Sequence, residues 1–169
     1  LHKRRAESVE RGFFLLSSAQ TVDDFRVLAA DLRGTEPGEQ AAFLLARRLY
    51  EDEQYADANV AFSEFLAEYS DSDLVAAARL GSAYALEADG RLDEAQDVFA
   101  ATADLVSDAA KTSEAWLGAG RCAELRGLDK QAVHFYENAV AALASGALRD
   151  QAVIALKRLQ VAHHASPRD

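Results

Sequence analysis

Methionine is absent from this sequence, cysteine occurs once and proline only twice. A single cysteine excludes an intramolecular disulfide, and Cys122 lies beside Ala119 and Ala123 in a predicted helix, where we expect a buried, unreactive thiol. No run of 18 apolar residues occurs, which excludes a transmembrane helix in this stretch, and no secretory signal pattern is present. Because the chain starts at Leu1 and has no methionine, we expect a processed or truncated piece, from which a signal peptide or anchor could have been removed.

Basic charge is also in short supply, since the 169 residues carry a formal net charge of −10. This balance argues against nucleic acid as the main partner, because phosphate binding needs a basic face. The first eleven residues differ, with four basic and two acidic side chains, so the remainder holds 14 basic and 26 acidic residues. That basic start could contact a membrane surface or an acidic partner, or it could be the solvated face of a first helix.

What the chain has in abundance is alanine, within a hydrophobic fraction of 50%. Alanine is the best helix former and the smallest side chain that fills a contact between helices. The composition therefore predicts an all-α protein with closely packed helices, and the length fits one domain.

Three kinds of residue return every 37 residues through the middle of the chain. The first series consists of the small residues Ala46, Ala83 and Gly120, and the second of the alanines Ala58, Ala95 and Ala132. The third series is aromatic and consists of Phe62, Phe99 and Tyr136. A repeat of this length predicts stacked helix pairs, in which the small residues permit close approach and the aromatics fill the seams between successive repeats. We expect about nine helices in a right-handed superhelix.

Apolar residues at three- and four-residue steps outline the individual segments. The expected boundaries are a degenerate leading helix pair at 1–36, repeats at 39–72, 73–109 and 110–146, a capping helix at 149–164, and a frayed tail at 165–169.

The repeat resembles the tetratricopeptide repeat (TPR) family. The third copy matches its pattern best, at Trp116, Gly120, Gly127, Ala132, Tyr136 and Ala139. Three departures are visible: the period is 37 rather than 34, no proline ends a second helix, and Phe65 stands where a small residue is usual. The resemblance implies an all-α TPR-like fold whose first helices line a concave groove.

The stretch from Tyr55 to Ser72 is similar to bacterial cell-envelope members of this family. These include outer-membrane assembly lipoproteins, Tol-Pal-associated factors and the ancillary subunit of the Sec translocon. The similarity implies a periplasmic or membrane-tethered protein, with the cytoplasm as the alternative, and membrane attachment only through an anchor absent from this chain.

In such a fold, core positions determine which residues of the first helices point into the groove. The predicted protein-binding residues are Gln40, Phe43, Arg47, Tyr50, Tyr84, Glu87, Glu114, Leu117, Arg121 and Glu124. Arg47, Tyr84 and Arg121 are equivalent positions, and two guanidinium groups beside a phenol suit an extended peptide with a carboxylate. The alternative is that these arginines pair with Glu51, Glu87 or Glu124. The family's Asn-based carboxylate clamp is not carried over, because these three residues replace the Asn.

Four consecutive large apolar residues near the start form a second candidate surface: Phe13, Phe14, Leu15 and Leu16. They cover more than half of a helix circumference, so that helix is either buried against the Phe25 helix or is partly an interface for a partner or a second copy.

Catalytic signatures are absent from the sequence. Gly118 and Gly120 lack the third glycine of a dinucleotide site, and no P-loop or HExxH motif occurs. His163 and His164 are adjacent, and adjacent helical residues do not face one metal ion. We therefore expect no enzyme activity, cofactor, metal or small-molecule substrate. The leading hypothesis is a protein-interaction scaffold that binds a peptide or protein segment in its groove; the alternative is a self-associating domain that uses the N-terminal helix.

Overall fold

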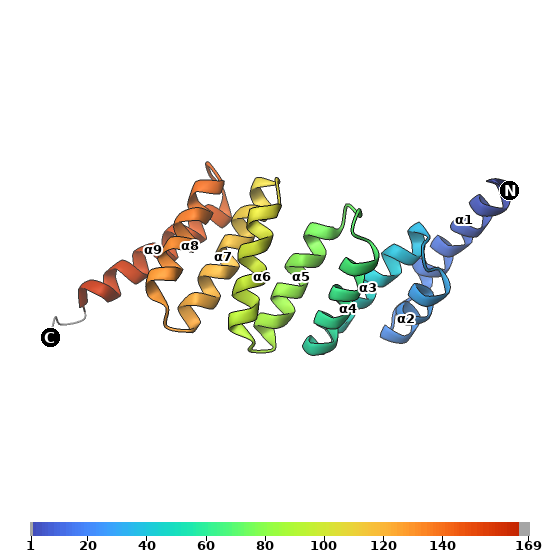
Figure 1. Cartoon of the computed structure of the whole chain (residues 1–169), viewed down its shortest axis with the longest axis horizontal. Coiled ribbons are helices and arrows are strands. Elements are labelled where there is room, and N and C mark those ends of the chain that lie inside the picture. The colour runs from blue at the N-terminus through green and yellow to red at the C-terminus, as the bar shows by residue number, and fades with distance from the viewer. Residues whose placement is uncertain (1, 166–169) are drawn as a thin grey trace. The chain divides into compact units, whose positions relative to one another are not determined.

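A computed structural model describes the backbone of residues 2–165 and the side chains of residues 9–161. Across these described residues the chain forms nine α-helices and no strand (Figure 1). They are α1 His2–Ser18, α2 Val22–Asp31, α3 Glu36–Glu51, α4 Tyr55–Glu68, α5 Val75–Ala88, α6 Leu92–Leu105, α7 Ala109–Leu125, α8 Asp129–Ala142 and α9 Ala147–Ala165. The all-α prediction is confirmed. Ala165 ends α9 instead of starting a tail, and residues 166–169 lie outside the described residues.

The chain divides into two compact units, at residues 1–85 and 86–169. The boundary falls inside α5, so unit 1 contains α1–α4 with most of α5, and unit 2 contains the last residues of α5 with α6–α9. Within unit 1, α3 packs against α1, α2 and α4, and within unit 2, α7 packs against α6, α8 and α9. In each unit, one helix, α3 or α7, is therefore packed against three neighbours.

Local sequence signals explain where several helices begin. Thr21 and Asp24 form a reciprocal capping box at the start of α2, and the Thr35 hydroxyl accepts a hydrogen bond from the Gly38 amide at the start of α3. The Asp108 carboxylate accepts one from the Lys111 amide at the start of α7. These side chains satisfy amide groups that have no partner within the helix.

The turns inside the three repeats share one left-handed backbone position. Glu53, Gly90 and Gly127 are 37 residues apart and have φ angles of 60°, 79° and 73°. Glycine adopts this conformation without steric cost, whereas a residue with a Cβ atom adopts it only with steric strain. In the first repeat, Glu53 therefore adopts a left-handed conformation that glycine adopts at the equivalent positions of the other two repeats.

The three periodic aromatic residues are buried, as the 37-residue spacing predicts, with exposed fractions of 2%, 0% and 3% for Phe62, Phe99 and Tyr136. Phe62 of α4 packs against Gly81 of α5, and Phe99 of α6 packs against Gly118 of α7. Both contacts join the second helix of one repeat to the first helix of the next. They confirm that the aromatic side chains fill the seams.

The last helix, α9, continues the same register. Ala155 of α9 lies 37 residues after Gly118 and is also buried. It packs in one core cluster with Tyr136 and Leu159. The predicted capping helix therefore takes the position of a first helix in the repeat pattern.

Gly120 provides a test of close helix packing. A Cβ atom built there would lie 2.5 Å from the Tyr136 ring, which is buried and cannot move aside freely. We expect Gly120→Leu to lower the free energy of unfolding by about 1–3 kcal/mol or more, measured by urea denaturation. Ala141→Leu, on the exposed side of α8, is the matched control and should change stability by less than about 0.5 kcal/mol. Equal effects would contradict the close approach.

Glu53 provides a second test, with the opposite sign. Glu53→Gly should raise the free energy of unfolding by about 0.5–1 kcal/mol, because relief of the left-handed strain exceeds the entropy that glycine adds to the unfolded chain. The control is Asp52→Gly, whose φ of −85° needs no glycine and which should destabilise. A loss of stability in both variants would show that Glu53 is unstrained.

Candidate protein-interaction face

The predicted groove residues of unit 1 lie on α3 and α5. Phe43 is half-buried and packs edge-on against Phe62 and Phe65, with ring centroids 6.0 and 5.7 Å away. Tyr50 stacks obliquely on Tyr55 at 5.3 Å. Gln40 and Tyr84 are half-buried as well. Phe43 therefore serves mainly the core, whereas the tyrosines combine packing with partial exposure.

Arg47 lies in a surface cleft of about 610 Å³. The cleft is lined by Ala19, Gln20, Thr21, Phe25, Leu44, Arg47, Arg48 and Glu51. Phe25 and Leu44 supply half-buried apolar surface, and the charged side chains come from consecutive turns of α3. The Arg47 side chain is 54% exposed and its Nη2 lies 3.3 Å from Glu51 Oε1, which is a long, single contact.

In unit 2, Leu117 is only 6% exposed and packs in the core with Tyr136, Ala152 and Leu159. It is a core residue, contrary to its predicted place in the groove. The cause is its register on α7, which directs Leu117 toward α8 and α9. Glu114, by contrast, is half-buried and remains at the surface.

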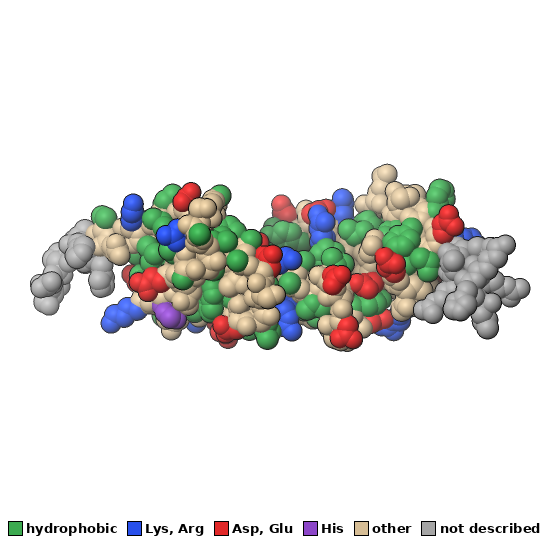
Figure 2. All heavy atoms as spheres, turned by 90° about the horizontal axis from the view of Figure 1, so that it is seen from above, with side chains coloured by type: hydrophobic (Ala, Val, Ile, Leu, Met, Phe, Trp, Pro, Cys, Tyr) green, Lys and Arg blue, Asp and Glu red, His purple; other side chains and the backbone are tan. Residues whose placement is uncertain are grey.

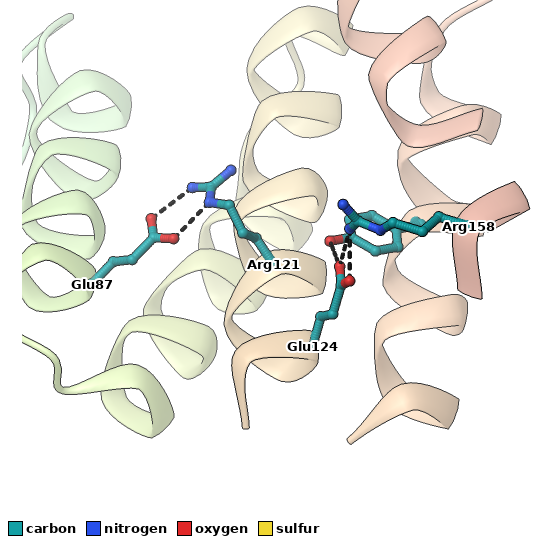
Figure 3. Close-up of polar contacts among 5 residues, drawn as sticks. Glu87, Arg121, Glu124 and Arg158 are labelled. Carbon is teal, nitrogen blue, oxygen red and sulfur yellow. Dashed lines mark hydrogen bonds and ion pairs between the residues drawn. The ribbon is translucent and has the colours of Figure 1, made fainter. Parts of the chain in front are cut away.

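Arg121 of α7 forms a two-pronged ion pair with Glu87 at the end of α5 (Figure 3). Its Nε and Nη2 atoms each lie 2.6 Å from a carboxylate oxygen. The Glu87 side chain is 15% exposed and that of Arg121 is 43% exposed. The guanidinium also lies 6.0 Å from the centroid of the Phe99 ring. Arg121 thus connects the charged surface with the aromatic seam beneath it.

The same pattern recurs one repeat later between Glu124 and Arg158 of α9 (Figure 3). The Arg158 Nη2 lies 2.6 Å from both Glu124 oxygens, and the Tyr136 hydroxyl donates a hydrogen bond of 2.9 Å to Glu124. Burial, together with this acceptor, raises the pKa of Tyr136, so the phenol stays protonated and continues to donate. Arg158 is missing from the predicted set, although it stands 37 residues after Arg121.

For both predicted arginines the structure shows pairing with the chain's own glutamates. Arg121 uses two nitrogens on Glu87, whereas Arg47 makes one 3.3 Å contact with Glu51. A ligand carboxylate would therefore displace little at Arg47 and much more at Arg121. On the face shown in Figure 2, red and blue side chains likewise lie interspersed.

The four apolar residues of α1 separate into two groups. Leu16 is buried and Phe13 half-buried, while Phe14 is 73% exposed and Leu15 38% exposed. Gly12, one turn before Leu16, would place a Cβ 2.6 Å from the Pro37 ring, so this side of α1 lies directly against α3. The helix is thus anchored on one side and presents Phe14 on the other.

Other candidate groups have a structural explanation or lie outside the described side chains. Cys122 is fully buried, and burial, followed by the charge of Glu87, raises the pKa of its thiol to about 12. Within the described residues no cluster of metal-ligating side chains occurs, and no helix is long and apolar enough to cross a membrane. The side chains of residues 1–8, His163 and His164 lie outside the described set.

Several solved structures share this arrangement of helices. A T3SS complex from Aeromonas hydrophila contains a chain that matches with a TM-score of 0.67 and 15% identity, over 90% of this chain and 96% of that one. A Podospora anserina kinesin light chain with nearly identical TPR-like repeats matches with a TM-score of 0.68 and 17% identity, over 95% and 87%; a variant of it gives the same values. The fold is a TPR-like helical repeat. No family model and no curated protein matches the sequence.

A double-mutant cycle tests the ion pair between successive TPR-like repeats. Glu87→Gln and Arg121→Met, made singly and together, should show a coupling energy of about 0.5–1 kcal/mol, a value kept low because Arg121 is partly exposed. The coupling should shrink in about 1 M salt. The control cycle on Arg91 and Glu94, three residues apart and both more exposed than Glu87, should give a smaller coupling. Equal couplings would mean that the inter-repeat geometry adds nothing.

Proposed function

We propose that this chain is a non-enzymatic protein-interaction scaffold that binds a peptide or protein segment on the surface of its first helices. The TPR-like fold supports the general role, since proteins of this architecture present helix surfaces to partners. The observation that carries the proposal is the cleft at Arg47, which combines apolar surface from Phe25 and Leu44 with an exposed guanidinium. Apolar surface with a few polar groups is the usual composition of a recognition site.

Arg47 is the proposed anchor for an acidic group of the ligand. Its 3.3 Å contact with Glu51 is long, and both side chains are more than half exposed, so exchange of one carboxylate for another costs little. Glu51 and Arg48 at the rim can then contact neighbouring polar groups of the ligand. Apolar ligand side chains would lie against Phe25 and Leu44.

In unit 2 the proposed face has a different character. Arg121 holds Glu87 and Arg158 holds Glu124, so these charged groups are oriented before a ligand arrives. Preorganised polar groups reduce the entropy lost on binding. We assign these residues a secondary role in positioning an extended ligand, beside Glu114.

A bacterial cell-envelope setting is part of the proposal. It is supported by the similarity of the Tyr55–Ser72 stretch to envelope members of the TPR family. The matching chain from a T3SS complex supports a bacterial secretion context in the same way.

The side-chain chemistry favours binding over catalysis. The Cys122 thiol is buried with a pKa of about 12, so it is a poor nucleophile at neutral pH. Glu87 and Glu124 each form an ion pair with an arginine, so their carboxylate oxygens are engaged within the chain.

The proposal can be tested with a phage-displayed library of random peptides selected on the purified chain. Selected peptides should carry an acidic residue next to apolar ones. Arg47→Met should weaken their binding by at least about tenfold, because one charge-assisted hydrogen bond contributes about 1.5–3 kcal/mol. The measurement is the dissociation constant from fluorescence polarisation.

Arg91→Met is the matched control, because Arg91 is a partly exposed, ion-paired arginine outside the cleft. It should leave binding unchanged, and neither variant should alter the melting temperature appreciably. Selected peptides that bind the wild type and Arg47→Met equally well would refute the role of the cleft.

Self-association through α1 is a second candidate function. It is favoured by one observation, the 73% exposure of Phe14 on a helix whose other side is anchored.

A further inference from the structure

Unit 1 contains a second cleft, of about 880 Å³, between α2 and α4 and above α3. Its floor is formed by Ala42, Leu45, Ala61 and Phe65, and Arg33 and Glu68 stand at its rim. Arg33 donates two hydrogen bonds of 2.7 Å to Glu68 across this rim. The cleft is therefore apolar below and charged at the edge, and it lies apart from the cleft at Arg47.

The equivalent positions of unit 2 carry large side chains where this cleft of unit 1 is lined by alanines. When 74 residues, the length of two repeats, are added to the residue numbers of α2, α3 and α4, their bounds match those of α6, α7 and α8 to within one residue. The exception is the start of α6, which begins about one turn earlier. Under this shift Ala42 and Ala61 correspond to Trp116 and Phe135. Those two rings stack on each other, with centroids 5.6 Å apart and planes 18° apart.

Large side chains in unit 1 occupy neighbouring positions instead. Leu45 and Phe65 correspond to Ala119 and Ala139 of unit 2 under the same shift. Phe65 is fully buried, where it packs against Phe43 and Tyr69. The aromatic volume of unit 1 thus lies deeper, and the place that a stacked pair fills in unit 2 stays open above the two alanines.

The chain itself carries a side chain that suits this space. Phe14 is the most exposed of its large apolar residues among those described, at 73%, and Leu15 beside it is 38% exposed. Gly12 and Leu16 hold the opposite side of α1 against its own unit. Phe14 therefore faces away from the core and is available to another molecule.

Charge favours a second copy of this chain as that molecule. The first eleven residues are net basic, while the remainder carries an excess of 12 acidic groups. Arg11 precedes Phe14 by about one helical turn and so accompanies it. The charged residues that line the cleft are Arg26, Arg33, Glu64 and Glu68. Arg33 is paired with Glu68 and Arg26 with Asp23, so Glu64 is the lining carboxylate that Arg11 of another copy can approach. An apolar side chain next to a basic one therefore matches an apolar floor next to the Glu64 carboxylate.

We propose that two copies of this chain associate by inserting Phe14 of each into the cleft over Ala42 and Ala61 of the other. The contact is reciprocal, so one interface contains it twice and closes with twofold symmetry. This site is independent of the peptide-binding proposal, because it uses neither Arg47 nor the ion pairs of unit 2.

The full 169-residue chain should be dimeric in sedimentation-velocity experiments over a concentration series. Phe14→Ser should raise the dimer dissociation constant at least about thirtyfold, because a buried aromatic anchor is lost twice from one interface. Since Phe14 is exposed, the variant should keep the wild-type melting temperature once both are monomeric. A wild-type chain that is monomeric throughout would overturn the proposal.

The receiving site is tested by Ala61→Phe, which places in unit 1 the residue found at the equivalent position of unit 2. This variant should also be monomeric while its circular dichroism spectrum remains that of a helical fold. Leu105→Ser, which removes another highly exposed apolar residue, is the control and should stay dimeric. If Phe14→Ser dissociates the dimer but a folded Ala61→Phe does not, α1 docks elsewhere and the cleft is not its site.

A mixture of the two variants distinguishes reciprocal insertion of Phe14 from general damage to either variant protein. Phe14→Ser retains an open cleft and Ala61→Phe retains Phe14, so an equimolar mixture can form one of the two reciprocal contacts. We expect a heterodimer that is weaker than the wild-type dimer and stronger than either variant alone. Absence of any association in the mixture would contradict the reciprocal insertion, whatever the effect of each single change.

Discussion

The packing of an aromatic ring onto a glycine is the contact on which this fold depends. Phe62 lies on Gly81 and Phe99 lies on Gly118, and a Cβ atom at either glycine would come within 2.4–2.6 Å of the ring. The ring contacts the helix backbone directly, so the second helix of one repeat and the first helix of the next come close together. Residues on the outer side of those first helices, including the charged pairs of unit 2, are aligned as a consequence.

Periodicity made the helices and their core predictable, because burial imposes the same small and aromatic residues on every repeat. It was less informative on the surface. Leu117 and Arg121 lie one turn apart on α7, yet Leu117 belongs to the core and Arg121 reaches the surface, where its side chain is partly exposed. Which side of a helix is covered depends on the neighbouring helix, and the sequence alone does not reveal this. Arg158 could have been found from the spacing, since the series at 47, 84 and 121 continues to it.

The cleft between α2 and α4 was hidden from sequence analysis for a different reason. Alanines at 42 and 61 look like ordinary helix-packing residues, and only the cleft above them, compared with the equivalent Trp116 and Phe135, shows that side-chain volume is missing. Phe65, which departs from the family pattern, is buried and accompanies these alanines: unit 1 has a large residue at 65 and a small one at 61, whereas unit 2 has the reverse at the equivalent positions. A feature produced by two compensating substitutions needs the three-dimensional register to be recognised.

The spacing of the ion pairs makes the structure modular. Glu87 and Glu124 of unit 2 each meet a guanidinium 34 residues further along, within a repeat of 37 residues. A tandem duplication of residues 88–124 would therefore give both copies of Glu124 a guanidinium at the same separation. Position 161, which would hold the next carboxylate, is an exposed valine, so the series ends without an unpaired charge. Whole repeats can thus be gained during evolution without disturbing the electrostatic balance of those already present.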